Sequence, residues 1–205
     1  MTIEIQVAQK EHALYADDIC HLIYTSAMAR GTGIAKRTPE YIIDKIENGK
    51  AIIALDGIRL VGFSYIETFS NNRFVTNSGL VVHPEYRNQG VARRIKKRIF
   101  ELARKLYPQA KIISITTGLA VMKMNTELGF KPVTFSELPA DEEFWRGCSG
   151  CRNYDILQRN NNKMCLCTGL LFDPMTKPKG VVKSVSTFTR KFVPIAKGIL
   201  KKDRL

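Results

Sequence analysis

The sequence predicts an α/β fold, and three observations carry this prediction. Short apolar runs typical of strands alternate with segments whose apolar residues recur at helical spacing. Asp56-Gly57 separates two apolar runs and predicts a β-hairpin, because this dipeptide is a strong signal for a short turn. Residues 78–106 then combine a strand, a loop rich in small residues and a long amphipathic helix.

Turn and capping residues mark most boundaries of the expected elements. Thr38 caps a helix that has Pro39 at its first position, and Gly49 ends that helix. Gly129 caps a later short helix. The predicted strands are residues 3–7, 51–55, 59–69, 74–82, 111–117 and 131–138. The predicted helices are residues 11–30, 40–48, 91–106 and 120–128.

Bulk composition is that of a globular protein with one domain and room for an appendage. The chain has 205 residues, of which 44% are hydrophobic. No run reaches the roughly 18 continuous apolar residues of a membrane span. The N-terminus shows no basic stretch followed by an apolar one, as a secretory signal would. We therefore expect a cytoplasmic protein without a membrane partner.

The net charge of +13 is unevenly placed along the chain. Residues 174–205 hold nine lysines and arginines against one acid, Asp203. A basic surface can attract an anionic cofactor, and a basic tail can contact nucleic acid or acidic lipid or stay solvated. Nucleic-acid binding ranks last, because no basic strand studded with aromatic residues is seen.

The junction at residues 87–92 is the most informative segment. A loop that opens a helix leaves backbone N–H groups unpaired, and the helix dipole adds partial positive charge there. Such a site suits a phosphate or pyrophosphate. Gly90 removes the Cβ that would keep an anion away from the backbone. An ordinary tight turn is the alternative interpretation.

The run Arg87-x-x-Gly90-x-Ala92, after a strand that ends in Val-His-Pro-Glu-Tyr, resembles the coenzyme A pyrophosphate loop of the GNAT acyltransferases. The resemblance covers about residues 3–140. It implies a mixed sheet that splays open after the fourth strand, and transfer of an acyl group from acetyl-CoA or succinyl-CoA to an amine. The implied architecture is a GNAT core of residues 1–140, a Cys-containing hairpin of residues 141–173 packed on or completing the core, and a basic tail of residues 174–205.

The resemblance also implies which residues hold the acyl-CoA. Leu80, Val81 and Val82 would pair with the pantetheine arm through their backbone. The pyrophosphate would lie on Arg87, Asn88, Gln89, Gly90, Val91 and Ala92. Cations on the following helix could reach the outer phosphates or could merely be solvated; these are Arg93, Arg94 and Lys97.

Catalysis needs a group that takes a proton from the amine. Glu67 lies near the position where related enzymes place a carboxylate, and His83 stands at the strand end and could titrate near neutral pH. An outward-facing glutamate, a structural histidine and a water relay are the alternatives. Asn125 stands where many GNAT enzymes carry a tyrosine that protonates the leaving thiolate. An amide cannot act as an acid, but it can hydrogen-bond sulfur.

A basic glycine-rich loop, residues 30–38, is expected over the acceptor side of the cleft. Arg30, Lys36 and Arg37 could clamp a carboxylated acceptor there, because arginine suits carboxylate recognition. A solvated basic loop is the alternative.

Four cysteines form two close pairs, Cys148-x2-Cys151 and Cys165-x-Cys167. A hairpin that brought the pairs together would give a structural zinc site of four thiolates. Buried free thiols are the alternative, since a reducing cytoplasm disfavours disulfides.

With the basic loop and residues 114–118, this cysteine segment resembles a bacterial subgroup associated with arginine biosynthesis in Bacteroidetes. That resemblance implies acylation of the α-amine of glutamate, a small-molecule amine acceptor. The competing hypotheses are a protein N-acyltransferase acting on lysines or N-termini, and a nucleic-acid-binding module. A homodimer is left open.

Overall fold

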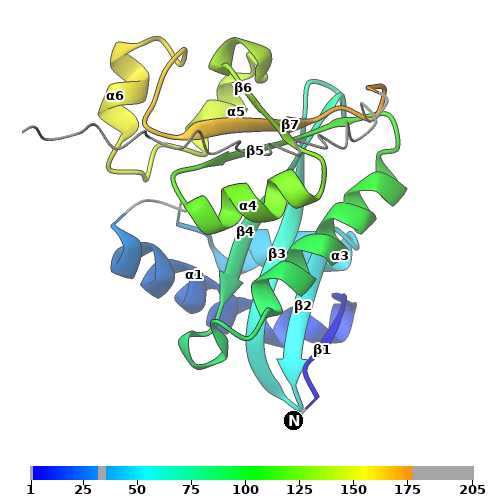
Figure 1. The fold of residues 1–205 in the computed structure, drawn as a ribbon. Coiled ribbons are helices and arrows are strands. Elements are labelled where there is room, and N and C mark those ends of the chain that lie inside the picture. The colour runs from blue at the N-terminus through cyan, green and yellow to red at the C-terminus, as the bar shows by residue number, and fades with distance from the viewer. Residues whose placement is uncertain (1, 32–35, 177–205) are drawn as a thin grey trace, which may run out of the picture.

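The computed structural model describes residues 2–31 and 36–176, so most of the predicted basic tail, residues 177–205, lies outside the described residues. A seven-stranded sheet has the order β1-β2-β3-β4-β5-β7-β6 (Figure 1). The strands are β1 (Glu4–Val7), β2 (Ala51–Asp56), β3 (Arg59–Phe69), β4 (Phe74–Val82), β5 (Lys111–Thr116), β6 (Lys131–Val133) and β7 (Thr168–Phe172).

The α-helices are α1 (Ala16–Arg30), α2 (Pro39–Glu47), α3 (Val91–Leu106), α4 (Leu119–Glu127), α5 (Glu142–Arg146) and α6 (Tyr154–Arg159). Short 3-10 helices are η1 (Lys10–Tyr15), η2 (Pro84–Tyr86) and η3 (Phe135–Glu137). Among the described residues, no helix combines the length and apolarity that crossing a bilayer would require.

The sheet is mixed, as predicted. Strands β1 to β4 form an antiparallel meander, β4 and β5 run parallel, and β7 pairs antiparallel with both β5 and β6. The strand predicted for residues 131–138 is wrong beyond residue 133. Thr134 and Glu137 form a capping box there, in which the Thr134 amide donates to the Glu137 carboxylate at 3.1 Å, and the chain turns into η3. The place between β5 and β6 is filled from further along the chain, by β7.

The helix predicted for residues 11–30 begins as a 3-10 helix. The Gln9 amide donates to Nδ1 of His12 at 2.8 Å, and this local bond holds the tighter turn. The regular α-helix starts at Ala16. The predicted cap of α2 is confirmed, because Oγ1 of Thr38 accepts a hydrogen bond from the Tyr41 amide at 3.3 Å.

The predicted splay between the fourth and fifth strands is present. β4 pairs with β5 only over residues 74–76, yet it continues to Val82 along β3. Beyond that point β5 pairs with β7 on its other side. A bulge marks the divergence: Ser64 of β3 faces both Gly79 and Leu80 in the register. Gly79 has φ +64°, and a Cβ there would lie 2.3 Å from the Tyr65 ring, so only glycine fits.

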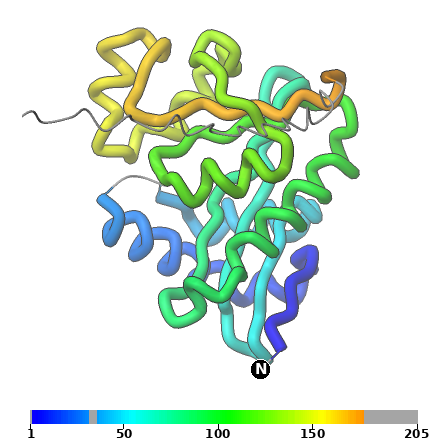
Figure 2. Tube along the Cα trace, in the orientation of Figure 1, coloured from blue at the N-terminus to red at the C-terminus, as the bar shows by residue number. Residues whose placement is uncertain are grey.

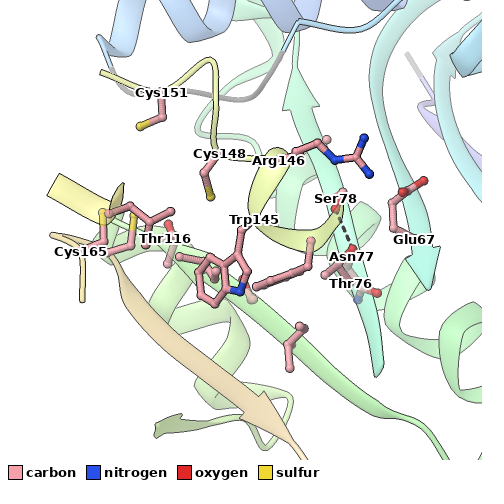
Figure 3. Close-up of a pocket in the computed structure, with 18 of the residues that line it drawn as sticks. Glu67, Thr76, Asn77, Ser78, Thr116, Trp145, Arg146, Cys148, Cys151 and Cys165 are labelled. Atoms are coloured by element: carbon pink, nitrogen blue, oxygen red, sulfur yellow. Dashed lines mark hydrogen bonds between the residues drawn. The ribbon is translucent and has the colours of Figure 1, made fainter. Parts of the chain in front are cut away.

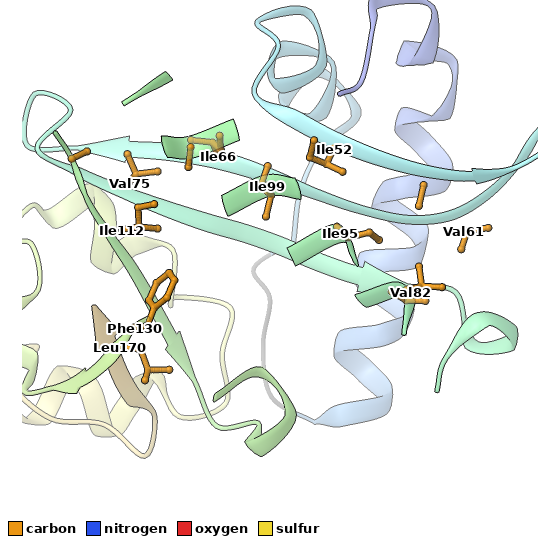
Figure 4. Close-up of a cluster of buried hydrophobic side chains, with 14 of the residues drawn as sticks. Ile52, Val61, Ile66, Val75, Val82, Ile95, Ile99, Ile112, Phe130 and Leu170 are labelled. Carbon is orange, nitrogen blue, oxygen red and sulfur yellow. The ribbon is translucent and has the colours of Figure 1, made fainter. Parts of the chain in front are cut away.

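Two hydrophobic cores cover the two faces of the meander. On one face α3 lays Ile95 and Ile99 on side chains of β2, β3 and β4, and this core extends to Phe130 and Leu170 (Figure 4). On the other face α1 and α2 bury their apolar sides against β2 and β3. Helix α4 packs with α3, so both helices lie on the same side of the splayed strands.

Residues 141–173 lie at the end of the molecule opposite the N-terminus (Figure 2). A third core joins α5 and α6 to β5, with Trp145 and Leu157 buried. The Trp145 indole donates to the Pro139 carbonyl at 2.9 Å, and Asp141 accepts from the Ser70 amide at 3.2 Å. Between the cysteine pairs stands the helix α6, not the two strands that a β-hairpin would supply. The division of the chain at residues 140 and 173 stays a prediction.

Candidate active site

The N-terminus of α3 has the geometry of an anion site. Gly90 is its N-cap residue with φ +76°, no side chain caps the helix, and no acidic residue lies in its first turn. Its first backbone N–H groups therefore lack intrahelical acceptors and carry the positive end of the helix dipole. A Cβ at Gly90 would meet no protein atom within 4 Å, so the backbone angle, not packing, requires glycine there.

Most side chains of the predicted pyrophosphate loop support the loop itself. Arg87 donates from Nε to the Val82 carbonyl at 3.1 Å and from Nη2 to Oγ of Ser26 at 3.2 Å. Gln89 donates to the Glu85 carbonyl at 2.9 Å. Asn88 has φ +62° and is exposed, Val91 is buried in the core and Ala92 is half-buried. An anion at this loop would be held mainly by the backbone.

Two of the three cations after the loop have a protein partner. Arg93 forms an ion pair with Glu127 at 3.0 Å, and Arg94 donates to the Ile3 carbonyl at 2.9 Å. Lys97 is exposed.

The predicted pantetheine strand lies at the edge of the splay. Val81 and Val82 pair with β3, and β5 is not paired to them on the other side. That edge leaves backbone groups of residues 80–82 accessible to an extended ligand. Leu80 also lines the cavity described next.

A cavity of about 490 Å³ lies beside the splay, between Arg30 and Arg37 on one side and residues 141–173 on the other. Its size is that of a small-molecule site. It is lined from the sheet by β3, β4 and β5, including Glu67, Asn77 and Gly79. Three guanidinium groups border it, from Arg30, Arg37 and Arg146, and Figure 3 shows Arg146 reaching toward the side of the cavity where Glu67 lies.

Two of the three residues predicted to clamp the acceptor, Arg30 and Arg37, line the cavity. Arg37 donates from Nε to the Tyr65 hydroxyl at 2.7 Å and lies 5.0 Å from the Tyr41 ring centroid. Burial and then the charge of Arg87 lower the pKa of Arg30. Lys36 is exposed and does not line the cavity, so the structure leaves it outside the predicted acceptor clamp.

Glu67 is the carboxylate that faces the cavity near the splay. Its Oε1 lies 2.8 Å from Nζ of Lys45, an ion pair of two largely buried side chains. Oε1 nevertheless has no aligned hydrogen bond, so this oxygen is held by charge more than by directed bonding. Burial raises the pKa of the neighbouring Tyr41, with Tyr65 and Glu67 adding to the effect, so that phenol stays neutral.

The other two predicted catalytic residues lie elsewhere. His83 borders a separate pocket beside α1, with Asp18 and His21, and it does not line the cavity that Glu67 faces. Its role as the amine's base stays a prediction, which this position beside α1 does not favour. Asn125 is fully buried in α4, and neither its amide nitrogen nor its oxygen has a hydrogen-bond partner.

The cysteines gather at the far end of the cavity, where Figure 3 shows Cys148, Cys151 and Cys165. Asn153 links the pairs, since its amide donates to Sγ of Cys151 at 3.5 Å and its carbonyl accepts from Cys165 at 3.8 Å. Burial, followed by the neighbouring thiols, raises the pKa of Cys148 to about 11 and that of Cys167 to about 12.

These thiols do not form the predicted zinc site in the conformations described. Across residues 2–31 and 36–176, no three histidine, cysteine or acidic side chains are close enough together to hold a metal ion. Without a bound metal, the raised pKa values keep these thiols neutral. No chemical step is therefore assigned to a metal. All four are free cysteines that line the acceptor cavity.

Sequence reasoning missed several residues of the cavity. Arg146 and Tyr154 come from the segment that was expected to hold zinc, and Tyr41 and Tyr65 were not considered. Asn77 was missed as well; it is half-buried, and both its side-chain polar atoms are buried without partners among the described residues. No local spacing signals these residues, because only the folding of residues 141–173 over β5 brings them to one place.

Comparisons with known proteins agree with this geometry. A family model described as an acetyltransferase (GNAT) domain matches residues 47–132, which include the splay and the Gly90 loop. A search of curated protein sequences gives no significant match. Solved structures at 20% identity or less share the fold.

Three of these structures are of particular interest. N-acetylglutamate synthase from Neisseria gonorrhoeae, complexed with coenzyme A and N-acetyl-glutamate, has a TM-score of 0.61 at 20% identity; the match covers 86% of this chain and 36% of that one. This chain thus spans about a third of that enzyme's length. Diaminobutyrate acetyltransferase from Paenibacillus lautus, complexed with L-2,4-diaminobutyric acid and coenzyme A, has a TM-score of 0.56 at 11% identity, over 87% and 99% of the two chains.

A Mycobacterium tuberculosis protein in complex with CoA has a TM-score of 0.59 at 14% identity, over 83% of this chain and 98% of that one. This chain therefore shares its fold with proteins whose structures contain coenzyme A. The chain described here has the GNAT fold, and the family model of a GNAT acetyltransferase domain matches its residues 47–132.

Proposed function

We propose that the protein transfers an acyl group from acyl-CoA to the amine of a small carboxylated acceptor, such as an amino acid. The observation that carries this proposal is the adjacency of two features. An extended ligand bound at the Gly90 loop can follow the free edge of β4 into the splay, and the cavity of about 490 Å³ opens beside that splay. The thioester and the acceptor amine would meet where the two join.

The charges of the cavity favour a carboxylated acceptor. Arg30, Arg37 and Arg146 border it, and guanidinium groups bind carboxylates with paired hydrogen bonds. Glutamate, with two carboxylates, matches three guanidinium groups well. The N-acetyl-glutamate complex of the Neisseria enzyme, on a similar fold, is consistent with this choice. Acetyl and succinyl donors are both compatible with it.

The residues divide the chemistry between them. The α3 N-terminus and the β4 edge hold the donor, and the guanidinium groups hold the acceptor. Glu67 takes the proton that the attacking amine releases, directly or through a water molecule. Backbone amides at the β4 bulge, near Gly79, lie where they could donate to the carbonyl oxygen as it gains charge.

A thiol-release assay tests the proposal. Acetyl-CoA and succinyl-CoA are offered with a panel of amino acids that includes glutamate, glutamine, 2,4-diaminobutyrate and lysine, each checked by mass spectrometry for the N-acyl product. We expect turnover with an acidic amino acid and the least turnover with lysine. Turnover only with peptides or protein amines would establish the protein-acceptor alternative instead.

The basic tail needs a separate control. A chain truncated after residue 176 is expected to keep its acyl-transfer rate, because all the described cavity residues precede that position. Salt-dependent binding of oligonucleotides by the full chain and not by the truncated chain would support the nucleic-acid alternative for the tail.

A further inference from the structure

Two polar side chains are buried between α3 and α4 without a protein partner. Lys96 is 2% exposed and Asn125 is 0% exposed. Both side-chain polar atoms of Asn125 lack hydrogen bonds. Among the described residues, Lys96 forms no ion pair or hydrogen bond; its ammonium lies 5.2 Å from the centroid of the Phe130 ring. Burying an ammonium and an amide unpaired is costly, so a ligand at this point would account for both.

The two side chains share one location. At the surface, the Arg93–Glu127 ion pair at 3.0 Å joins the first turn of α3 to the last residue of α4. Lys96 lies one turn after Arg93, and Asn125 lies two residues before Glu127. Phe130 connects them, because its amide donates to the Asn125 carbonyl at 3.0 Å and its ring lies against Lys96. Both residues therefore lie beside Phe130, where α3 and α4 meet.

The gap between these helices overlies the gap between the splayed strands. Helix α3 packs on β4, and α4 packs on β5, on the same side of the sheet (Figure 1). The cavity is lined mainly from the other side, by residues of α1, α2 and the segment 141–173, and Val121 of α4 also lines it. A thioester held in the splay would thus be reached by the acceptor from one face and by Lys96 and Asn125 from the other.

The chemical states of the two groups differ. Burial lowers the pKa of Lys96 to about 7, and burial is the whole cause: no charged group of the described strands beneath α3, or of α4, adds to it. An ammonium with this pKa can release its proton at neutral pH. Asn125 can only donate or accept a hydrogen bond.

We propose that Lys96 donates a proton to the departing coenzyme A sulfur, and that Asn125 hydrogen-bonds the same sulfur. The inference rests on the proposed function and deepens it. The amine forms a bond to the thioester carbon and releases one proton to Glu67 or water. The carbon–sulfur bond breaks, its electron pair goes to sulfur, and the sulfur takes a proton from the Lys96 ammonium. Neutral Lys96 then regains a proton from solvent, so protons and electrons balance.

Binding measurements separate this role from a structural one. The pair of probes is coenzyme A and desulfo-coenzyme A, which lacks the thiol, titrated by calorimetry into wild-type protein, Lys96→Met and the control Lys105→Met. Lys105 is an exposed lysine on the same helix. Wild type is expected to bind coenzyme A about five- to tenfold more tightly than desulfo-coenzyme A, because one hydrogen bond to a charged group contributes about this much. Lys96→Met loses that preference and keeps its affinity for desulfo-coenzyme A, and Lys105→Met behaves as wild type.

The rate supplies a second readout. We expect kcat of Lys96→Met to fall at least about tenfold, a modest share of what general acids contribute. The decline of wild-type kcat above pH 7, where Lys96 loses its proton, should be absent from the variant. Equal loss of affinity for both probes in Lys96→Met, or an unchanged preference for the thiol, would overturn the inference. Failure of wild type to bind either probe would instead overturn the proposed function.

Discussion

At the scale of single residues, the candidate site is marked by polar groups that the fold buries without satisfying. Asn77 faces the acceptor cavity, and Asn125 and Lys96 lie between α3 and α4. Most buried polar groups in folded proteins have partners, so these residues are candidates for ligand contacts. Neither helical spacing nor composition distinguishes Lys96 from the solvated lysines of the same basic helix, which is why the sequence could not single it out.

Removing the Lys96 charge should stabilise the fold, with a pH dependence that follows from its pKa. The folded-state pKa is about 7, below the ordinary value of 10.5, so between these values the unfolded chain binds more protons than the folded one. The free energy of unfolding of the wild type therefore increases as the pH rises from about 7 to 10 and Lys96 loses its proton. We expect Lys96→Met to melt about 5 °C higher at pH 7, with a gain that shrinks toward pH 10.

Differential scanning calorimetry of wild type, Lys96→Met and Lys105→Met across this pH range measures the effect. A lower melting temperature for Lys96→Met at pH 7 would contradict the unpaired burial of this lysine.

Glu67 offers a second test at the same scale. Glu67→Gln keeps the shape of the side chain but removes the proton acceptor and the ion pair with Lys45. We expect kcat to fall about a hundredfold, at the low end of general-base contributions, while the affinity for coenzyme A stays the same. Steady-state kinetics with the best acceptor, with Glu47→Gln as an exposed control on α2, check this. An unchanged kcat would assign proton removal to water alone.

At the scale of elements, the junction between β4 and α3 is the part that the sequence predicts best. Its signals are local: an apolar run that ends at residue 82, helical spacing in residues 91–106 and a glycine between them. The splay depends on the pairing of β5 with β7, fifty residues further along the chain, and no local pattern reveals it. The strand assigned to residues 131–138 failed for a local reason, since the capping box of Thr134 and Glu137 outweighed strand propensity.

Two glycines give a matched test of the loop. Gly90 and Gly57 both have positive φ, +76° and +60°, and a Cβ at either would meet no protein atom within 4 Å. Gly90→Val and Gly57→Val should therefore lose similar stability, about 1–2 kcal/mol from backbone strain. Only Gly90→Val should raise the Kd for coenzyme A, by about tenfold or more, because only that turn presents free amides to the pyrophosphate. Calorimetry on both variants measures the Kd for coenzyme A. Equal Kd values for the two variants would mean that the pyrophosphate binds elsewhere.

At the scale of the whole molecule, residues 141–173 turn an open sheet face into a cavity. They supply β7, which fills the place between β5 and β6, and they close the acceptor side with α5 and α6. The sequence drew attention to this segment through its cysteines and suggested a metal. The structure instead uses it as a wall, in which the cysteines are neutral lining residues and Arg146 is the cation.

Substitution of Arg146 therefore tests whether residues 141–173 select the acceptor. It is exposed, and Figure 3 shows its guanidinium on the side of the cavity where Glu67 lies. Arg146→Met should raise KM for a carboxylated acceptor about tenfold or more, the loss of one charge-assisted contact, and should leave the Kd for coenzyme A unchanged. Arg159→Met is the matched control, because Arg159 pairs with Asp155 on its own helix and does not line the cavity. A parallel rise in acceptor KM for both variants would mean that general positive charge, and not this guanidinium, draws the acceptor in; no change in either would place the acceptor away from residues 141–173.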